Sequence, residues 1–301
     1  MYSAKIWKVK VKNPSKVNPE WLSKVLAENR GLSNEKKMHD FLNPTLEQVL
    51  GVKLSQLKQG INRVEQAISN KEKIVVYSDY DADGITASAI MWETLNDLGA
   101  NVMPYVPHRI KEGYGLAIPA IEELAKQGIT LIVTVDHGVT AVKQIEAAKK
   151  LKVDVVVTDH HVMPKIGPKP YAMVHSTELC GAGVAWLFCY HLVSKIEPEY
   201  LEKLLEKLEL AAIATIADLV PLNAASRAIV KIGLEKLNKT KRPGIKCLLS
   251  ATGTSGAIGT YEIGHVIAPK INAMGRIEHG LDALRLVCAK NQNRAQRLAA
   301  L

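Results

Sequence analysis

The stretch IVVYSDYDADGIT, residues 74–86, decides the fold and points to the chemistry of this protein. Its first four residues are apolar and mostly β-branched, which predicts a buried strand. Three aspartates then follow at alternate positions, Asp79, Asp81 and Asp83, and Gly84 leads into a helical pattern. Such closely spaced carboxylates repel one another unless a cation lies between them, so the cluster predicts a site for one or two divalent metal ions. The alternative is a solvated acidic turn.

Strands and helices alternate beyond this stretch. Apolar runs predict strands at 74–78, 102–106, 130–135 and 153–158, and the intervening segments predict helices at 85–98, 116–127 and 140–151. Strands that are apolar throughout and joined by helices imply a parallel sheet with helices on both faces. We therefore expect an α/β fold, followed after Pro170 by a mainly helical C-terminal part.

Upstream of the central strand the chain is basic and is interrupted by Asn-Pro pairs. We expect a short strand near Lys5–Val11 and a helix around Glu20–Asn29. The apolar spacing from Leu54 to Ile68 predicts an amphipathic helix that leads into the central strand.

Composition limits the class of protein. The chain has 301 residues and a formal net charge of +9, which suggests a polyanionic partner. No apolar run is as long as a membrane span, and the first residues lack the apolar core of a signal peptide. The four cysteines form no C-x-x-C pair, which indicates reduced thiols. We expect a cytoplasmic protein with no membrane partner.

Acidic and histidine residues follow several of the predicted strands. Asp136 lies in TVDHG, the run Asp159-His160-His161 follows VDVVVT, and Asp218 lies in TIADLVPL. The carboxyl ends of parallel strands form the active edge of such sheets, so these residues should converge on the aspartate cluster. Oxygen-rich ligands with one imidazole suit Mn²⁺ or Mg²⁺ better than Zn²⁺. The number of carboxylates predicts two bridged ions, an arrangement that clamps the attacking and leaving oxygens in phosphoryl transfer.

Other interpretations remain open for single residues. Asp136 could be a helix N-cap. Asp218 lies in an apolar helical run, where a buried carboxylate is costly without a cationic partner, and this favours the metal interpretation. Arg109 follows a strand and could be an anion contact or merely exposed. Four further histidines are expected to be structural or at the surface: His175, His191, His265 and His279.

The motifs DYDADG, TVDHG, Asp-His-His and IADLVPL, in this order and spacing, resemble those of the DHH phosphoesterase superfamily. Within it, VPHRIKEGYGL, CGAGVAW and PKINAMGRI resemble segments of the RecJ-like single-stranded-DNA-specific exonucleases. The resemblance covers nearly the whole chain. It implies a Mn²⁺- or Mg²⁺-dependent 5′→3′ exonuclease that hydrolyses single-stranded DNA to 5′-mononucleotides by two-metal phosphodiester hydrolysis, in DNA repair and recombination.

The resemblance also implies two ligand sets that share Asp136 as a bridge. One ion would be held by Asp79, Asp81 and Asp136, and the other by Asp83, Asp136, His160 and Asp218.

Four residues would act on the substrate or support those that do. His161 and Arg276 would contact the scissile phosphate. Asp159 would orient the histidine pair, and Arg109 would recognise the 5′ end of the strand.

The chain departs from the family pattern at its C-terminus. RecJ-like proteins continue into a DHHA1 domain and often an OB-fold, and neither is present in this sequence. We therefore expect a basic N-terminal extension (1–50), a DHH domain (51–280, with the sheet up to about 180) and the start of a connecting helix (281–301).

Partners and rival functions follow from the same resemblance. The expected partner is single-stranded DNA, together with a helicase or a single-strand-binding protein. One alternative is a phosphodiesterase for short oligonucleotides or cyclic dinucleotides. Another is a non-catalytic DNA-binding or replication-scaffold relative, in which metal ligands should have been lost.

Overall fold

The computed structural model describes residues 18–301 except 33, 109–111, 114 and 278–279. The described residues form two units, the first ending at Pro44 and the second beginning at Thr45. The N-terminal extension that we predict from the sequence ends later, at residue 50. The difference arises because Val49 is fully buried in the core of the second unit.

The first unit contains two helices, α1 (Pro19–Asn29) and α2 (Glu35–Leu42). Asparagine side chains accept hydrogen bonds from backbone N–H groups in the first turn of each helix, which defines where each one begins. The predicted helix around 20–29 is confirmed. The predicted strand near 5–11 lies outside the described residues.

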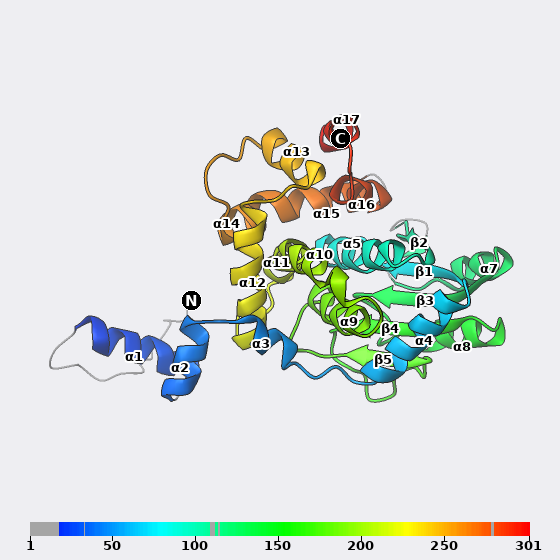
Figure 1. Cartoon of the computed structure of the whole chain (residues 1–301), viewed down its shortest axis with the longest axis horizontal. Helices are drawn as coiled ribbons and strands as arrows, with labels where there is room; N and C mark the ends of the chain where they lie inside the picture. Colours follow the sequence, from blue (N-terminus) through cyan, green and yellow to red (C-terminus); the bar gives the residue numbers. More distant parts are fainter. Residues whose placement is uncertain (1–17, 33, 109–111, 114, 278–279) are drawn as a thin grey trace, which may run out of the picture. The chain divides into compact units, whose positions relative to one another are not determined.

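Five parallel strands form the centre of the second unit, in the order β2-β1-β3-β4-β5 (Figure 1). They are β1 (Lys73–Ser78), β2 (Asn101–Tyr105), β3 (Ile129–Val135), β4 (Asp154–Asp159) and β5 (Ala172–His175). The first four confirm predicted strands. The sequence does not predict β5, because its four residues follow a proline-rich stretch and are too few to show a period.

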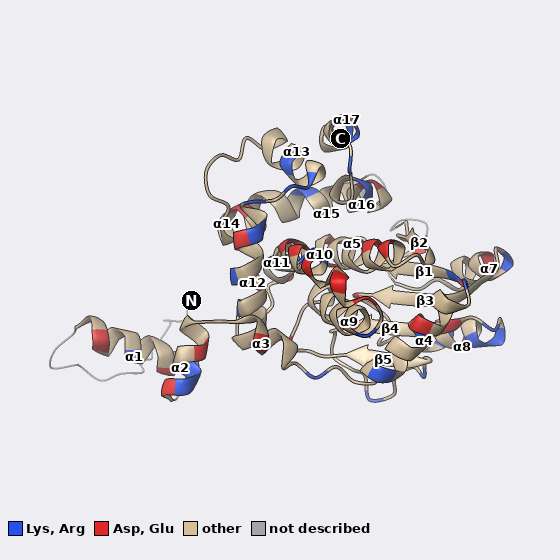
Figure 2. Ribbon diagram, in the orientation of Figure 1, with Lys and Arg blue, Asp and Glu red and all other residues tan. Residues whose placement is uncertain are grey.

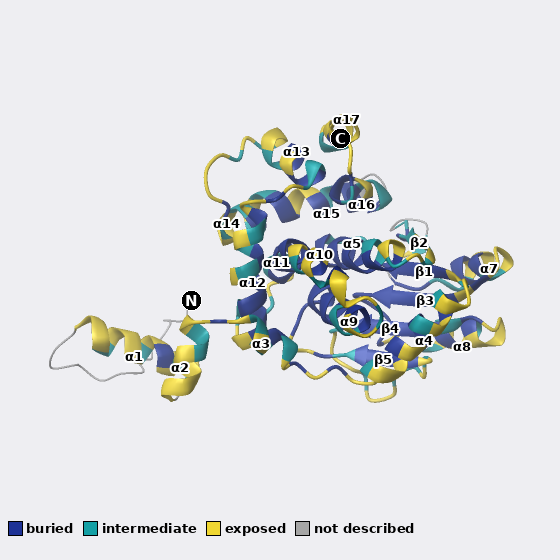
Figure 3. Ribbon diagram, viewed as in Figure 1, coloured by how far each residue is buried: buried dark blue, intermediate teal, exposed yellow. Residues whose placement is uncertain are grey.

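Helices cover both faces of this sheet. Side chains such as Val76 and Val133 pack toward α4 (Leu57–Ser69), α5 (Ala82–Asp97) and α9 (Gly181–Ile196). Their neighbours Val75 and Ile132 pack on the opposite face toward α7 (Ile118–Lys126) and α8 (Val142–Lys150). Figure 3 shows β1, β3 and β4 buried between these layers, whereas the residues of the edge strand β2 are intermediate or exposed. The α/β fold with a parallel sheet and helices on both faces is thus confirmed.

The part of the second unit after β5 is mainly helical, as predicted. Beyond α9, its elements are η1 (Pro198–Tyr200), α10 (Leu201–Glu206), α11 (Leu208–Ala217), α12 (Ala224–Leu237), α13 (Pro243–Ala251), α14 (Thr260–Glu262), the π-helical turn η2 (Ile263–Ile267), α15 (Ala268–Ile277), α16 (Gly280–Val287) and α17 (Gln292–Ala299). Of these, α11, α15 and α16 pack against α5 (Figure 1), while the short helix α3 (Leu46–Leu50) precedes the sheet and packs against α12.

The C-terminal segment differs from the predicted connecting helix. Two helices occupy it, because the side chain of Asn291 accepts a hydrogen bond from the N–H of Arg294 and caps a new helix, α17. The four cysteines are free thiols. Within the described ranges, no helix combines the length and apolar character that a membrane crossing requires.

The strand order fixes where a site can form. β1 lies between β2 and β3, so the chain leaves β1 on one side and later returns on the other. In open parallel sheets this reversal leaves a crevice beyond the carboxyl ends of the two central strands. Asp79 and Asp136 follow β1 and β3 directly, and therefore lie at that crevice.

Candidate metal centre

The loop after β1 is held in a compact turn. The Asp79 carboxylate accepts a hydrogen bond from the N–H of Tyr80 at 2.7 Å, and Asp81 accepts one from the N–H of Gly84 at 2.9 Å. A Cβ atom on Gly84 would lie 2.7 Å from the Cβ of Asp79, so only glycine fits at this position. The three aspartates are therefore fixed by the start of α5 and do not lie on a free loop.

Asp136 has an unusual backbone conformation. Its φ angle is +66°, in the left-handed region that aspartate and asparagine tolerate better than most residues. Its N–H donates to the carbonyl of Thr158 on β4 at 3.0 Å. A Cβ atom on Gly181 would lie 2.5 Å from the Cβ and Oδ1 atoms of Asp136, so the N-terminus of α9 closes over this side chain.

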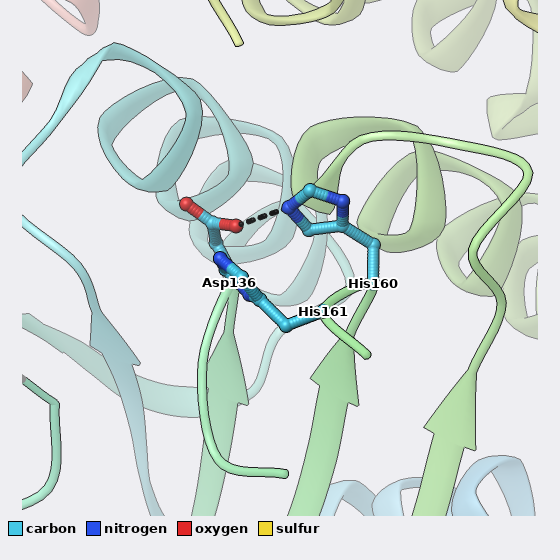
Figure 4. Close-up of side chains that lie close together, drawn as sticks. All are labelled: Asp136, His160 and His161. Atoms are coloured by element: carbon cyan, nitrogen blue, oxygen red, sulfur yellow. Dashed lines mark ion pairs between the residues drawn. The ribbon is translucent and has the colours of Figure 1, made fainter. Parts of the chain in front are cut away.

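The predicted ligands converge. Nε2 of His160 lies 3.1 Å from Oδ1 of Asp136 (Figure 4), 3.7 Å from Oδ2 of Asp83 and 3.6 Å from Oδ2 of Asp218. Three groups bring their ligand atoms within 4.8 Å of one another, and Asp136 belongs to two of them: Asp79–Asp81–Asp136, Asp83–His160–Asp218 and Asp136–His160–His161. The first two groups contain the side chains that the family resemblance implies for two separate ions.

Oδ1 of Asp136 and Nε2 of His160 are buried at the centre of this cluster and make no hydrogen bond of acceptable geometry, although they lie 3.1 Å from each other. A buried acceptor without a partner costs free energy, and the cost is larger for a carboxylate. Asp83 differs, because its two oxygens accept hydrogen bonds from the N–H groups of Gly181 and Ala182, both at 2.7 Å. The residues therefore fit a divalent cation, with one wall held by α9 and the free atoms aimed inward.

The acids raise one another's pKa. Burial and then the charge of Asp81 raise the pKa of Asp79 to about 7. The pKa of Asp136 is raised well above its ordinary value, mainly by burial and secondly by the charge of Asp83. The pKa values of Asp83 and Asp218 are also raised, mainly by burial and secondly by the charge of Asp81. Burial and then His161 lower the pKa of His160 to about 4, which keeps its imidazole neutral. A cation bound among these groups would offset their mutual repulsion and lower their pKa values, so that the carboxylates would be ionised.

His161 lies beside this cluster and is oriented by Asp159. The Asp159 carboxylate is 2.8 Å from Nδ1 of His161, and it accepts hydrogen bonds from the backbone N–H groups of His160 and Val139. Burial alone would raise the pKa of Asp159, but the hydrogen bond with His161 and the backbone N–H groups outweigh burial and lower it to about 2. The same contact raises the pKa of His161, whose side chain is 45% exposed. The contact with Asp159 therefore favours the protonated form of the His161 imidazole, which lies at the mouth of the centre.

Two predicted substrate contacts are not described in full. Arg109 lies outside the described residues. The backbone of Arg276 belongs to α15, and its side chain is outside the described part of the chain.

Several supporting residues are not predicted from the sequence. Asn272 of α15 accepts a hydrogen bond from the N–H of Ala82 at 2.7 Å, and Gly275 lies against the carbonyl of Tyr80. Asn272 stands in PKINAMGRI, which the sequence singled out only for Arg276.

Two histidines also support the centre. His137 lies buried with Nε2 3.0 Å from the carbonyl of Tyr77, and burial lowers its pKa to about 4. His175, expected to be structural or at the surface, lies with Nε2 2.7 Å from the carbonyl of His161.

Comparison with known proteins shows which family this chain is similar to. Residues 73–215 match the model of the DHH family, N-terminal domain. The single-stranded-DNA-specific exonuclease RecJ of Bacillus subtilis (strain 168) is 39% identical over 284 residues, which are 91% of this chain and 34% of that protein.

Solved structures agree with this match. A crystal structure of exonuclease RecJ bound to manganese superimposes with a TM-score of 0.75 at 35% identity, covering 83% of this chain and 65% of that one. RecJ from Thermus thermophilus in complex with Mn²⁺ gives a TM-score of 0.78 at 31% identity, covering 92% and 40%. Among curated RecJ relatives the chain spans between 34% and 48% of their length.

Proposed function

Since residues 73–215 of this chain belong to the DHH family, we propose that the chain is the hydrolytic part of a 5′→3′ exonuclease specific for single-stranded DNA. The observation that carries the proposal is the pair of ligand groups that meet at His160 and Asp136, with an unpartnered buried atom on each of these two residues. Relatives named as single-stranded-DNA-specific exonucleases, and RecJ structures bound to Mn²⁺, support it.

We assign the two ligand sets as the resemblance to the DHH phosphoesterases implies them. Asp79, Asp81 and Asp136 would hold one Mn²⁺ or Mg²⁺ ion, and the other would be held by Asp83, Asp136, His160 and Asp218. When bound, a pair of such ions supplies Lewis-acid polarisation of the phosphate and lowers the pKa of water.

The chain's own residues would bind and orient the substrate. His161, whose protonated form Asp159 favours, would donate a hydrogen bond to an oxygen of the scissile phosphate and stabilise the charge that grows there. The backbone position of Arg276 on α15, the helix that contacts the aspartate loop, is consistent with a second phosphate contact. Arg109 would recognise the 5′ end of the strand.

Basic side chains on the later helices would follow the DNA backbone. Figure 2 shows Lys and Arg on α13, α16 and α17, which carry Lys246, Arg285, Arg294 and Arg297. Such contacts are independent of sequence and weaken as salt rises. We expect the whole protein to act in DNA repair and recombination in the cytoplasm, with a helicase or single-strand-binding protein as partner.

The test is cleavage of end-labelled 5′-phosphorylated single-stranded and double-stranded DNA by this chain, with Mn²⁺, with Mg²⁺ and with EDTA. We expect mononucleotide release from the single strand alone, only with metal, and its loss in Asp136→Ala. Glu146→Ala, an exposed acid on α8, is the matched control and should retain full activity. Metal-dependent cleavage by Asp136→Ala would contradict the bridging assignment.

A series of strand lengths in the same assay separates the rival activity. Preference for dinucleotides or cyclic dinucleotides over longer strands would favour a phosphodiesterase for short substrates.

A further inference from the structure

The three most exposed large apolar side chains among the described residues all lie on segments that leave the metal centre. Val162 is 84% exposed, Ile166 is 85% exposed and Leu219 is 86% exposed. Every other exposed large apolar side chain in the described ranges is 71% exposed or less. We call these three residues the apolar rim.

Chain connectivity places the rim beside the ligands. Val162 directly follows His161, and Leu219 directly follows Asp218. Consecutive Cα atoms are about 3.8 Å apart, so the rim begins within one residue of the histidine pair on one segment and of a carboxylate ligand on the other. Because Asp218 and His160 approach to 3.6 Å, the two segments leave the centre from neighbouring points.

The backbone at Leu219 is held so that its side chain points to solvent. Its φ angle is +58°, a conformation that is costly for a leucine, whereas Val220 turns back and packs against the core. The left-handed backbone is usual just after the end of a helix, and the N–H of Leu219 bonds to the carbonyl of Ile216 in α11. This turn leaves the leucine side chain exposed beside Asp218, where it is free to contact a ligand.

The segment with Val162 and Ile166 also folds back toward the centre. A Cβ atom on Gly167 would lie 3.5 Å from Met163 and 3.7 Å from the carbonyl of Val139, the residue whose N–H binds Asp159. Lys165 and Lys169 are exposed on the same segment. Apolar and cationic side chains therefore alternate along the exposed segment that follows the histidine pair.

From this arrangement we infer that the apolar rim contacts the unstacked bases of the one or two nucleotides next to the scissile phosphate. Base faces are accessible to apolar side chains in a single strand and are covered by stacking in a duplex, while the two lysines suit the backbone phosphates. The rim would thus contribute to selection of single strands. The inference rests on the proposed function and adds the part of the substrate that is recognised.

The test compares two 5′-phosphorylated strands of equal length, one with bases throughout and one abasic at its first three positions. We expect the wild-type chain to cleave the strand with bases about tenfold faster, a factor typical of losing one base contact. The variant Val162→Ala/Leu219→Ala should reduce this preference to under about threefold and leave the abasic rate within about twofold of wild type. Leu151→Ala, an exposed leucine just after α8, is the matched control.

Two results would overturn the inference. One is an unchanged preference in the double variant. The other is an equal loss on both strands, which would indicate a structural role or contact with another protein segment.

Binding of the same strands, measured by fluorescence anisotropy with Ca²⁺ in place of Mn²⁺, keeps the inference separate from the proposed function. If the wild-type chain cleaves neither strand, the proposed function fails. The inference about the apolar rim is then supported if the wild-type chain binds the strand with bases more tightly than the abasic strand and the double variant does not. It is overturned if the wild type and the double variant show the same preference.

Discussion

The side-chain oxygen of Asn272 accepts a hydrogen bond from the N–H of Ala82 at 2.7 Å and so joins α15 to the first turn of α5. The two residues are 190 positions apart in the sequence. The N–H groups of a first turn have no partner within their own helix, so this bond caps α5 where two of its neighbours, Asp81 and Asp83, enter the metal centre. The backbone of Arg276 belongs to the same helix, α15. One hydrogen bond therefore links the aspartate turn to the helix that carries Arg276.

Replacing Asn272 by alanine should disturb the centre more than the fold. We expect Asn272→Ala to lower the free energy of unfolding by about 1 kcal/mol, the usual value of one cap. Mn²⁺-dependent cleavage should fall by about tenfold, because the aspartate turn loses its support. Urea unfolding and cleavage rates measure the two effects. Full activity in a variant that lost this stability would show that the contact is only structural.

Gly275 should tolerate no side chain. A Cβ atom there would lie 2.1 Å from the carbonyl oxygen of Tyr80, so Gly275→Ala must push α15 away from the aspartate turn. We expect a loss of about 1–3 kcal/mol in stability and of most activity. Gly264→Ala is the control, since its nearest neighbour would be Ile216 at 3.7 Å. If both glycine variants behaved alike in unfolding and cleavage assays, the close contact between Gly275 and the carbonyl of Tyr80 would not be needed for activity.

Asp136→Asn should separate metal binding from folding. The raised pKa of Asp136 means that its ionised form costs stability in metal-free protein once the pH exceeds the unfolded value. Asparagine removes that charge and tolerates the left-handed backbone, so the metal-free variant should melt at a higher temperature than wild type.

The same variant should lose its response to metal. Mn²⁺ at about 100 times its Kd should stabilise the wild type by about 2.7 kcal/mol and the variant by much less. Thermal melts with EDTA and with Mn²⁺ measure both effects, and Glu146→Gln should respond as the wild type does. An unchanged Mn²⁺ effect in Asp136→Asn would contradict the bridging role.

A buried ion pair away from the centre gives a pH prediction. Glu93 receives two hydrogen bonds from Arg242, at 2.7 and 2.8 Å, and Lys207 lies 3.2 Å away. Burial alone would raise the pKa of Glu93, but the pairing with Arg242 outweighs burial and lowers it from 4.5 to about 2. The folded pKa is the lower one, so the stabilisation is complete above pH 4.5 and is lost as the pH falls toward 2.

Glu93→Gln should therefore cost about 3 kcal/mol near pH 7, the free energy that corresponds to this pKa difference. In urea unfolding experiments, the difference in free energy of unfolding between variant and wild type should become smaller below about pH 4.5. Glu206→Gln, which breaks an exposed pair with Lys236, should cost less than about 1 kcal/mol at any pH. A gap that stays constant down to about pH 3 would contradict the assigned pairing.

Local patterns were sufficient to predict the main elements of the fold. Apolar β-branched runs such as 130–135 and their amphipathic neighbours predicted four of the five strands, and the ends of those strands predicted where the acids and histidines gather. These features depend on residues close in sequence.

The unpredicted features depend on distant segments. The bonds from Gly181 and Ala182 to Asp83 span almost a hundred positions, and the cap from Asn272 spans more. No period or spacing records such contacts. The break at Asn291 was missed for a different reason, because an asparagine in a basic helical pattern signals a cap only once the preceding helix is seen to stop.

The reversal of strand order between β1 and β3 has a mechanical consequence. Asp79 and Asp83 belong to the half of the sheet that begins at β1, whereas Asp136 and His160 belong to the half that begins at β3. Ions bound by residues of both halves would cross-link β1 and β3, the two strands between which the chain reverses direction across the sheet. Loading of the centre should then slow amide exchange along the β1–β3 junction, far more than in the outer strand β5.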